Sequence, residues 1–118
     1  MEMTRRKLAG AAMAAGAQET VRPVPAEEIP VKKVAVGGGS CGSMLADALA
    51  AGCDTFVTAD VKYDQYLEAK ALGITLMDAG HYATENVVCA PLVQRLAEQF
   101  PDTTGLLSAC HKEVYGSV

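Results

Sequence analysis

His81 and Glu85, four residues apart, are the two side chains whose types and spacing point most directly to chemistry. A neutral imidazole nitrogen and a carboxylate oxygen both bind divalent metal ions well. If residues 82–85 form the first turn of a helix, the two side chains face the same spot, because positions i and i+4 are neighbours on a helix. Two donors do not fill a coordination shell, so water, a substrate or another part of the protein must supply the rest.

The same pair also has a purely structural interpretation. Glu85 can act only as a favourable negative charge in the first turn of a helix. His81 can be a surface histidine or a histidine at the capped end of the helix. The spacing alone does not decide between these interpretations and a metal site.

A glycine-rich turn, Gly37-Gly38-Gly39-Ser40, is a second candidate site, and one interpretation of it is a ligand-binding loop. A strand that enters a helix through such a turn presents backbone N–H groups to an anion. Its spacing matches neither the dinucleotide-binding fingerprint nor the P-loop, whose lysine is missing here. The alternative is structural, since glycines let a chain turn sharply and let a helix pack close to a sheet.

The elements that must position these residues alternate between strands and helices. Strands are expected at Val31–Val36, Thr55–Thr58, Ile74–Met77 and Gly105–Cys110, with a short edge piece within Glu19–Val24. Helices are expected at Thr4–Ala15, Met44–Ala51, Val61–Leu72 and Asn86–Phe100. This alternation predicts an α/β fold with a largely parallel or mixed sheet flanked by helices.

The carboxyl ends of the predicted strands bring the candidate residues together. Ligands of open α/β sheets bind at these ends. The glycine-rich turn, Asp60 and His81 each follow a predicted strand, so the fold predicts one shared site. Asp60 is the candidate for a catalytic role, in which it orients a metal ligand or accepts a proton from water.

Length and charge limit the classes of function. The chain has 118 residues, which fits a single domain, and a net charge of −4. Its largest basic cluster is Arg5-Arg6-Lys7, so nucleic-acid binding has no electrostatic support. No apolar run is long enough to span a bilayer, and no membrane partner is expected. The four cysteines have wide, irregular spacings and are expected to be reduced and mostly buried.

The N-terminus allows two interpretations. A charged start followed by an alanine- and glycine-rich stretch has the outline of a signal peptide. Alanine also favours helices strongly, so an ordinary surface helix fits as well. Cytoplasm is the default location.

Four motifs in order resemble the C-terminal half of the NGG-one-interacting-factor-three proteins. They are GGGSCGS after a strand, LADALAAG, TADVKY after a strand, and DAGHYATE. These proteins are also called the dinuclear metal centre family and are often described as GTP cyclohydrolase I type 2 homologues. The order of the motifs is specific, whereas any single one is not. The resemblance covers about Val21 to Cys110, which divides the single domain 1–118 into a helical N-terminus at 1–18 and a family-like core at 21–110.

The resemblance implies that His81 and Glu85 are metal ligands and that the cofactor is a divalent metal such as zinc, iron or manganese. It also implies one half of a two-domain fold that assembles as a toroidal hexamer. The family site takes a further pair of histidines and an aspartate from an N-terminal half that this sequence lacks. The chain is therefore expected to be a fragment, a split gene product or a truncated form, incomplete as a catalyst. Relatives often carry histidine at the position of Asp64, so that position is assigned no role.

Three functions follow as hypotheses. The first is a metal-dependent hydrolase that works when the complete site is assembled. The second is a non-catalytic metal-binding or assembly module, and the third is a nucleotide-binding domain built on Gly37–Ser43. The expected partners are further copies of the chain or a separate N-terminal half. The substrate is not identified by the resemblance.

Overall fold

The computed structural model describes residues 2–14, 22–24 and 28–116. The helices are α1 (Arg5–Ala14), the 3-10 turn η1 (Gly42–Met44), α2 (Leu45–Ala50), α3 (Tyr63–Leu72), α4 (His81–Asn86) and α5 (Cys89–Gln99). The strands are β1 (Arg22–Val24), β2 (Val34–Val36), β3 (Thr55–Thr58) and β4 (Thr75–Asp78). The last residue of the predicted helix Thr4–Ala15 and the first three residues of the Glu19–Val24 piece lie outside the described residues.

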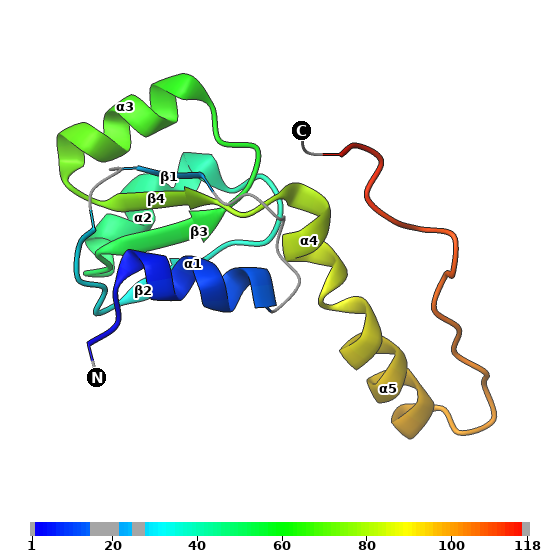
Figure 1. The fold of residues 1–118 in the computed structure, drawn as a ribbon. Helices are drawn as coiled ribbons and strands as arrows, with labels where there is room; N and C mark the ends of the chain where they lie inside the picture. The colour runs from blue at the N-terminus through cyan, green and yellow to red at the C-terminus, as the bar shows by residue number, and fades with distance from the viewer. Residues whose placement is uncertain (1, 15–21, 25–27, 117–118) are drawn as a thin grey trace.

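The described strands form one sheet in the order β1-β4-β3-β2 (Figure 1). Strands β2, β3 and β4 run parallel, and the helices α2 and α3 connect them. Strand β1 pairs antiparallel with β4 and occupies that edge of the sheet. The structure thus confirms an α/β fold with a largely parallel, mixed sheet.

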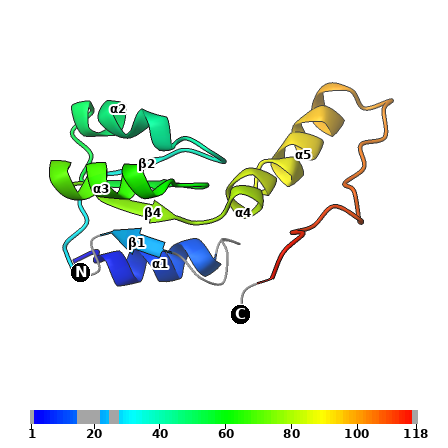
Figure 2. The same cartoon turned by 90° about the horizontal axis from the view of Figure 1, so that it is seen from above.

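The core lies on both faces of β3 and β4. Phe56 and Leu76 are paired across these strands and pack with Leu45 of α2 on one face. Val57 and Met77, the next pair along, pack on the opposite face with α1. Figure 2 shows α1 and α2 on opposite sides of the sheet. Because both faces are covered, these strands are apolar without alternation, as is typical of parallel sheets.

The predicted strand Gly105–Cys110 is wrong. These residues have no regular structure and are exposed. Figure 1 shows the segment after α5 running outside the sheet. A strand needs a neighbour for its backbone hydrogen bonds, and this segment pairs with neither edge strand, β1 or β2. The first predicted strand is also shorter than expected, beginning at Val34 rather than Val31.

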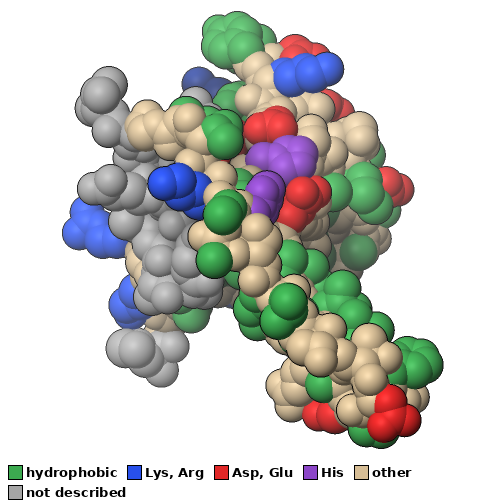
Figure 3. Space-filling model, turned by 90° about the vertical axis from the view of Figure 1, so that its right-hand side faces the viewer, with side chains coloured by type: hydrophobic (Ala, Val, Ile, Leu, Met, Phe, Trp, Pro, Cys, Tyr) green, Lys and Arg blue, Asp and Glu red, His purple; other side chains and the backbone are tan. Residues whose placement is uncertain are grey.

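The predicted helix Asn86–Phe100 corresponds to α5, and the helical turn expected at residues 82–85 belongs to a separate helix, α4. Helix α4 ends at Asn86, a turn follows at residues 87–88, and α5 begins at Cys89. Pro91 lies in the first turn of α5, where its missing N–H has no helical partner to lose. Helix α5 contains no buried residue. Its hydrophobic side chains lie on the surface of the projecting segment (Figure 3). Leu92 and Leu96 of α5 are 51% and 44% exposed, and the flanking Val88 and Phe100 are 58% and 59% exposed.

The cysteines only partly match their prediction. All four are free, but Cys53 is the one that is buried, and Cys110 is exposed. Most of them are therefore accessible at least in part. Among the described helices, none has the length and apolarity that crossing a membrane requires.

Candidate metal centre

A buried carboxylate positions the two loops that carry the candidate residues. Asp78, the last residue of β4, is 2% exposed. Its Oδ1 accepts a hydrogen bond from the N–H of Gly80 (3.1 Å), and its Oδ2 accepts one from the N–H of Val61 (3.1 Å). Asp78 thus ties the loop after β3 to the loop after β4. Sequence reasoning did not assign this role, and an acidic residue at the end of an apolar strand was its only signal.

His81 and Glu85 lie together, with Asp60 beside them. Asp60 Oδ2 is 2.5 Å from His81 Nδ1, and Glu85 Oε2 is 3.2 Å from His81 Nε2. The imidazole thus lies between two carboxylates, one on each ring nitrogen. Each of the three side chains is at least 40% exposed, so the group is open to solvent. The histidine side chains and neighbouring acidic side chains are visible on one face of the molecule in Figure 3.

Asp60 has an unusual backbone conformation. Its φ of 50° lies in the left-handed region, where it is the one non-glycine residue of the described chain. Aspartate is among the few residues that adopt this conformation with little penalty. The conformation directs the Asp60 side chain to the ring of His81, which lies 21 positions later in the sequence.

The glycine-rich turn forms the floor under the pair. Gly39 has a φ of 69°, and a Cβ atom there would lie 3.1 Å from His81 Nε2 and collide with the Glu85 carboxylate. The N–H of Gly39 donates to Thr84 Oγ1 (2.8 Å), and its carbonyl accepts from Thr58 Oγ1 (2.9 Å). Glycine at position 39 therefore keeps open the space that the two side chains occupy.

The other residues of the turn differ in their positions. A Cβ atom on Gly38 would lie 3.8 Å from Glu85 Cγ, so Gly38 also borders the pair. A Cβ atom on Gly37 would instead meet Cys41, and Ser40 is exposed. The N–H groups of Gly37, Gly39 and Cys41 all donate to acceptors within the protein. This favours the structural interpretation of the turn over anion binding.

The two carboxylates change the acidity of His81. The hydrogen bond with Asp60 raises the pKa of His81 above its usual value of 6.5. Partial burial of the ring works in the opposite direction, and the negative charge of Glu85 adds to the increase in pKa. The ring therefore keeps its second proton to a higher pH than an isolated histidine does.

The donor chemistry fits one divalent ion between His81 and Glu85. Two donors that each lie about 2.1 Å from one ion are roughly 3.0 to 3.5 Å apart, and the observed Nε2–Oε2 distance is 3.2 Å. A carboxylate on the other ring nitrogen is the usual partner of a metal-binding histidine, and Asp60 occupies that position. The described part of the chain contains no group of three or more His, Cys, Asp or Glu that could hold a metal ion. The described residues therefore offer a partial set of donors.

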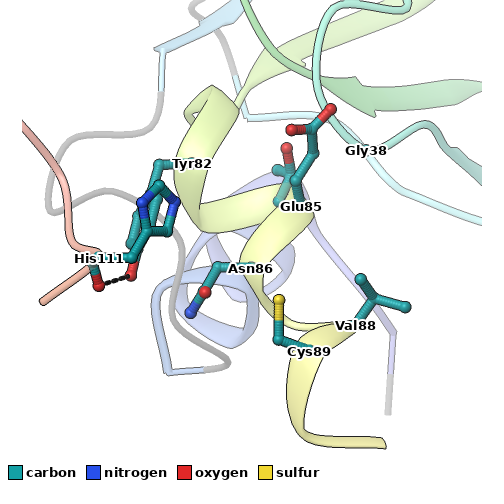
Figure 4. A pocket seen from close by; sticks show the side chains of 8 residues that line it. Gly38, Tyr82, Glu85, Asn86, Val88, Cys89 and His111 are labelled. Carbon is teal, nitrogen blue, oxygen red and sulfur yellow. Dashed lines mark hydrogen bonds between the residues drawn. The ribbon is translucent and has the colours of Figure 1, made fainter. Parts of the chain in front are cut away.

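A cavity adjoins the pair on the side of α5, and sequence reasoning missed it. Figure 4 shows its lining side chains, which come from α4, the start of α5 and the C-terminal segment. The rings of Tyr82 and His111 lie with their centroids 5.1 Å apart. The Tyr82 hydroxyl donates to the backbone carbonyl of His111 (3.1 Å). No spacing in the sequence predicts this contact, because 29 positions separate the two residues.

Comparison with known proteins matches this chain to a described family. The profile of the Duf34/NIF3 (NGG1p interacting factor 3) family matches residues 1–113. A Nostoc protein named GTP cyclohydrolase 1 type 2 homolog is 39% identical over 66 residues, which are 56% of this chain and 25% of that protein. A Streptomyces coelicolor protein of the same name is 46% identical over 59 residues, 49% of this chain and 21% of that protein. The chain thus spans about a quarter of the length of these relatives.

Solved structures share the fold. A Staphylococcus aureus hypothetical protein matches with a TM-score of 0.86 and 27% identity, covering all of this chain and 40% of the other. A Bacillus cereus protein related to NIF3 matches with a TM-score of 0.81 and 25% identity, covering all of this chain and 34% of the other. In both cases the matched protein contains much additional chain.

Proposed function

Because the chain belongs to the Duf34/NIF3 family, we propose that it carries part of a divalent-metal site of a metal-dependent hydrolase, with His81 and Glu85 as metal ligands. The observation that carries the proposal is the 3.2 Å separation of His81 Nε2 and Glu85 Oε2, with Asp60 on the other ring nitrogen. Zinc, iron and manganese are the candidate ions, since imidazole and carboxylate together suit all three.

Each residue has a distinct task in this proposal. A bound divalent ion would lower the pKa of a coordinated water and polarise an oxygen of the substrate. His81 offers Nε2 as a donor once that nitrogen has lost its proton. Asp60 keeps the proton on Nδ1 and holds the ring in place. Glu85 supplies a negative charge, and Gly39 leaves room for both ligands.

Catalysis requires donors beyond these two. We propose that they come from a separate N-terminal half or from further copies of the chain, with a hexamer as the expected assembly. The relatives that are named GTP cyclohydrolase 1 type 2 homolog make GTP the first substrate to test. A cytoplasmic location stays a prediction.

A non-catalytic metal-binding or assembly module is the second candidate function. Two observations favour it: the donor set of the described chain is partial, and the apolar side chains of α5 are exposed. A nucleotide-binding loop at Gly37–Ser43 has less support, because amides of that turn already donate within the protein.

Manganese binding by the purified chain tests the assignment of the ligands. Electron paramagnetic resonance of free Mn²⁺ measures how much ion the protein removes from solution. We expect a weakly held ion that chelators remove and that His81→Ala no longer binds. His111→Ala is the matched control, because the chain has two histidines and His111 is outside the proposed pair. Equal binding by His81→Ala and the unmodified chain would refute the assignment.

Measurements of GTP turnover and of the mass of the assembled protein distinguish the two candidate functions. With Mn²⁺ and GTP, product release that stops in Glu85→Gln supports the hydrolase. A metal-dependent increase in sedimentation without turnover supports the assembly module. The Glu68→Gln variant, altered at an exposed position of α3, serves as the control for both measurements.

A further inference from the structure

We propose that the cavity beside the metal pair binds the flat, uncharged ring of a nitrogen heterocycle with a lactam edge, and that any phosphate of the same ligand lies outside it. This inference rests on the proposed function for the chemistry that the bound ring would undergo. The cavity has a volume of about 540 Å³, which is within the range of small-molecule sites. Its lining residues are Gly38, Tyr82, Thr84, Glu85, Asn86, Val88, Cys89 and His111.

Glu85 belongs to both the cavity and the metal pair. Its carboxylate lies 3.2 Å from His81 Nε2, and the same residue lines the cavity. Gly38, which borders Glu85, also lines it. A ligand in the cavity therefore lies next to the position where a metal would be held, rather than in a separate part of the molecule.

Aromatic rings form one wall of the cavity. Tyr82 and His111 pack at an interplanar angle of 58°, and the hydrogen bond from the Tyr82 hydroxyl to the His111 carbonyl fixes their relative positions. Figure 4 shows the two rings against each other. Val88 and Cys89 add apolar surface. A flat heterocycle gains stacking energy on such a wall, whatever groups its ring edge carries.

Asn86 supplies the polar group that would select a ring edge. It lies four positions after Tyr82, so the two side chains are neighbours on α4, and it lines the same cavity. A primary amide has an acceptor oxygen and N–H donors side by side. It therefore complements a ring edge on which a donor and an acceptor adjoin, as the ring N–H and the carbonyl of a lactam do.

The charge of the lining argues against a phosphate in the cavity. Glu85 is the acidic residue among the lining residues, and they include neither lysine nor arginine. A phosphate would meet the negative charge of Glu85 with no lysine or arginine in the lining to offset it, unless a metal is bound. An uncharged ring meets no such penalty.

Inosine is the probe, because it is soluble, uncharged and has a lactam edge. We expect titration of the ¹⁵N-labelled full chain to shift the amide signals of Tyr82, Asn86, Cys89 and His111. In 1-methylinosine the ring N–H is replaced, so we expect weaker binding. Inorganic triphosphate in the absence of metal should leave these signals unchanged.

Variants then locate the site. Tyr82→Ala should weaken inosine binding by about tenfold, as loss of one stacking contact does. His111→Ala should also weaken it and changes only an exposed segment, so it remains informative if Tyr82→Ala does not fold. Tyr63→Ala is the matched control, because Tyr63 is 78% exposed on α3 and does not line the cavity.

The outcomes distinguish this inference from the proposed function. If His81→Ala still binds inosine and the unmodified chain binds no Mn²⁺, the ring site is supported and the metal site is refuted. Mn²⁺ binding without inosine shifts at the cavity residues would refute the ring site alone. Equal inosine affinity in the unmodified chain, Tyr82→Ala and His111→Ala would also overturn it.

Discussion

The sheet region, residues 28–86, and the C-terminal region, residues 87–116, differ in what their apolar side chains contact. In the sheet region Leu76 and Met77 are fully buried, with helices on both faces. In the C-terminal region none of the described residues is buried, although α5 is a regular helix of 11 residues. The difference teaches that the spacing of apolar residues along the sequence can indicate a helix. Burial of those side chains also requires a second surface to pack against.

The candidate site lies where these two regions meet. His81 and Glu85 belong to α4, which Asp78 and Gly80 tie to the sheet. One wall of the cavity instead includes Cys89 and His111 from the C-terminal region. The metal donors are therefore held by a packed core, and the proposed ring site depends partly on a region without one.

The largest predicted effect is the loss of a core side chain from the sheet region. Leu76→Ala should lower the free energy of unfolding by about 3 to 5 kcal/mol, because Leu76 is 0% exposed and its removal leaves a cavity between packed strands and helices. Urea unfolding followed by circular dichroism measures the change. A loss below about 1 kcal/mol would show that the core is looser than the packing indicates.

A smaller effect is expected at the floor of the site. Gly39→Ala should cost about 1 to 3 kcal/mol, because Gly39 has a positive φ and a Cβ atom there collides with Glu85. Gly73→Ala is the matched control, since Gly73 has a φ of 72° with nothing within 4 Å of its Cβ position. Urea unfolding of both variants separates backbone strain from the collision. Equal costs would mean that Glu85 moves aside freely.

The third prediction concerns the pH dependence of the sheet region. Burial alone would raise the pKa of Asp54, but hydrogen bonds from the Lys33 N–H, the Thr55 hydroxyl and the Lys32 N–H outweigh it and lower the pKa below its usual 3.8. A lowered pKa gives stability that is complete above the usual value and is lost as pH falls through the native value.

Asp54→Asn tests this pH dependence. The variant should be less stable than the unmodified chain at pH 7, by about 1 kcal/mol, and this difference should shrink below about pH 4. Urea unfolding at a series of pH values measures both chains. A difference that stays constant to pH 3 would contradict the assignment to Asp54.

The smallest predicted effect completes the comparison of the two regions. Leu96→Ala makes the same chemical change as Leu76→Ala, but in α5, where Leu96 is 44% exposed. It should change the free energy of unfolding by no more than about 0.5 kcal/mol, as surface substitutions do. A cost above about 2 kcal/mol would show that α5 is covered in solution, for instance by another copy of the chain.

Much of the fold could be predicted from the sequence because it depends on local pattern. Strand Thr55–Thr58 has its predicted bounds, and the predicted strand Ile74–Met77 is displaced by one residue. The strand predicted at Gly105–Cys110 failed because the segment after α5 runs outside the sheet and pairs with neither edge strand. The separation of α4 from α5 depended on a turn at residues 87–88 that no glycine marks.

The sequence by itself determined that His81 and Glu85 share one side of a helical turn, because four positions along a helix bring side chains together. Only the tertiary structure decided that Asp60 meets the other nitrogen of His81 and that Gly39 lies beneath the pair. It also decided that Tyr82 and His111 form a wall of a cavity. These contacts join segments that are distant in sequence, and their geometry depends on how the strands, loops and helices pack.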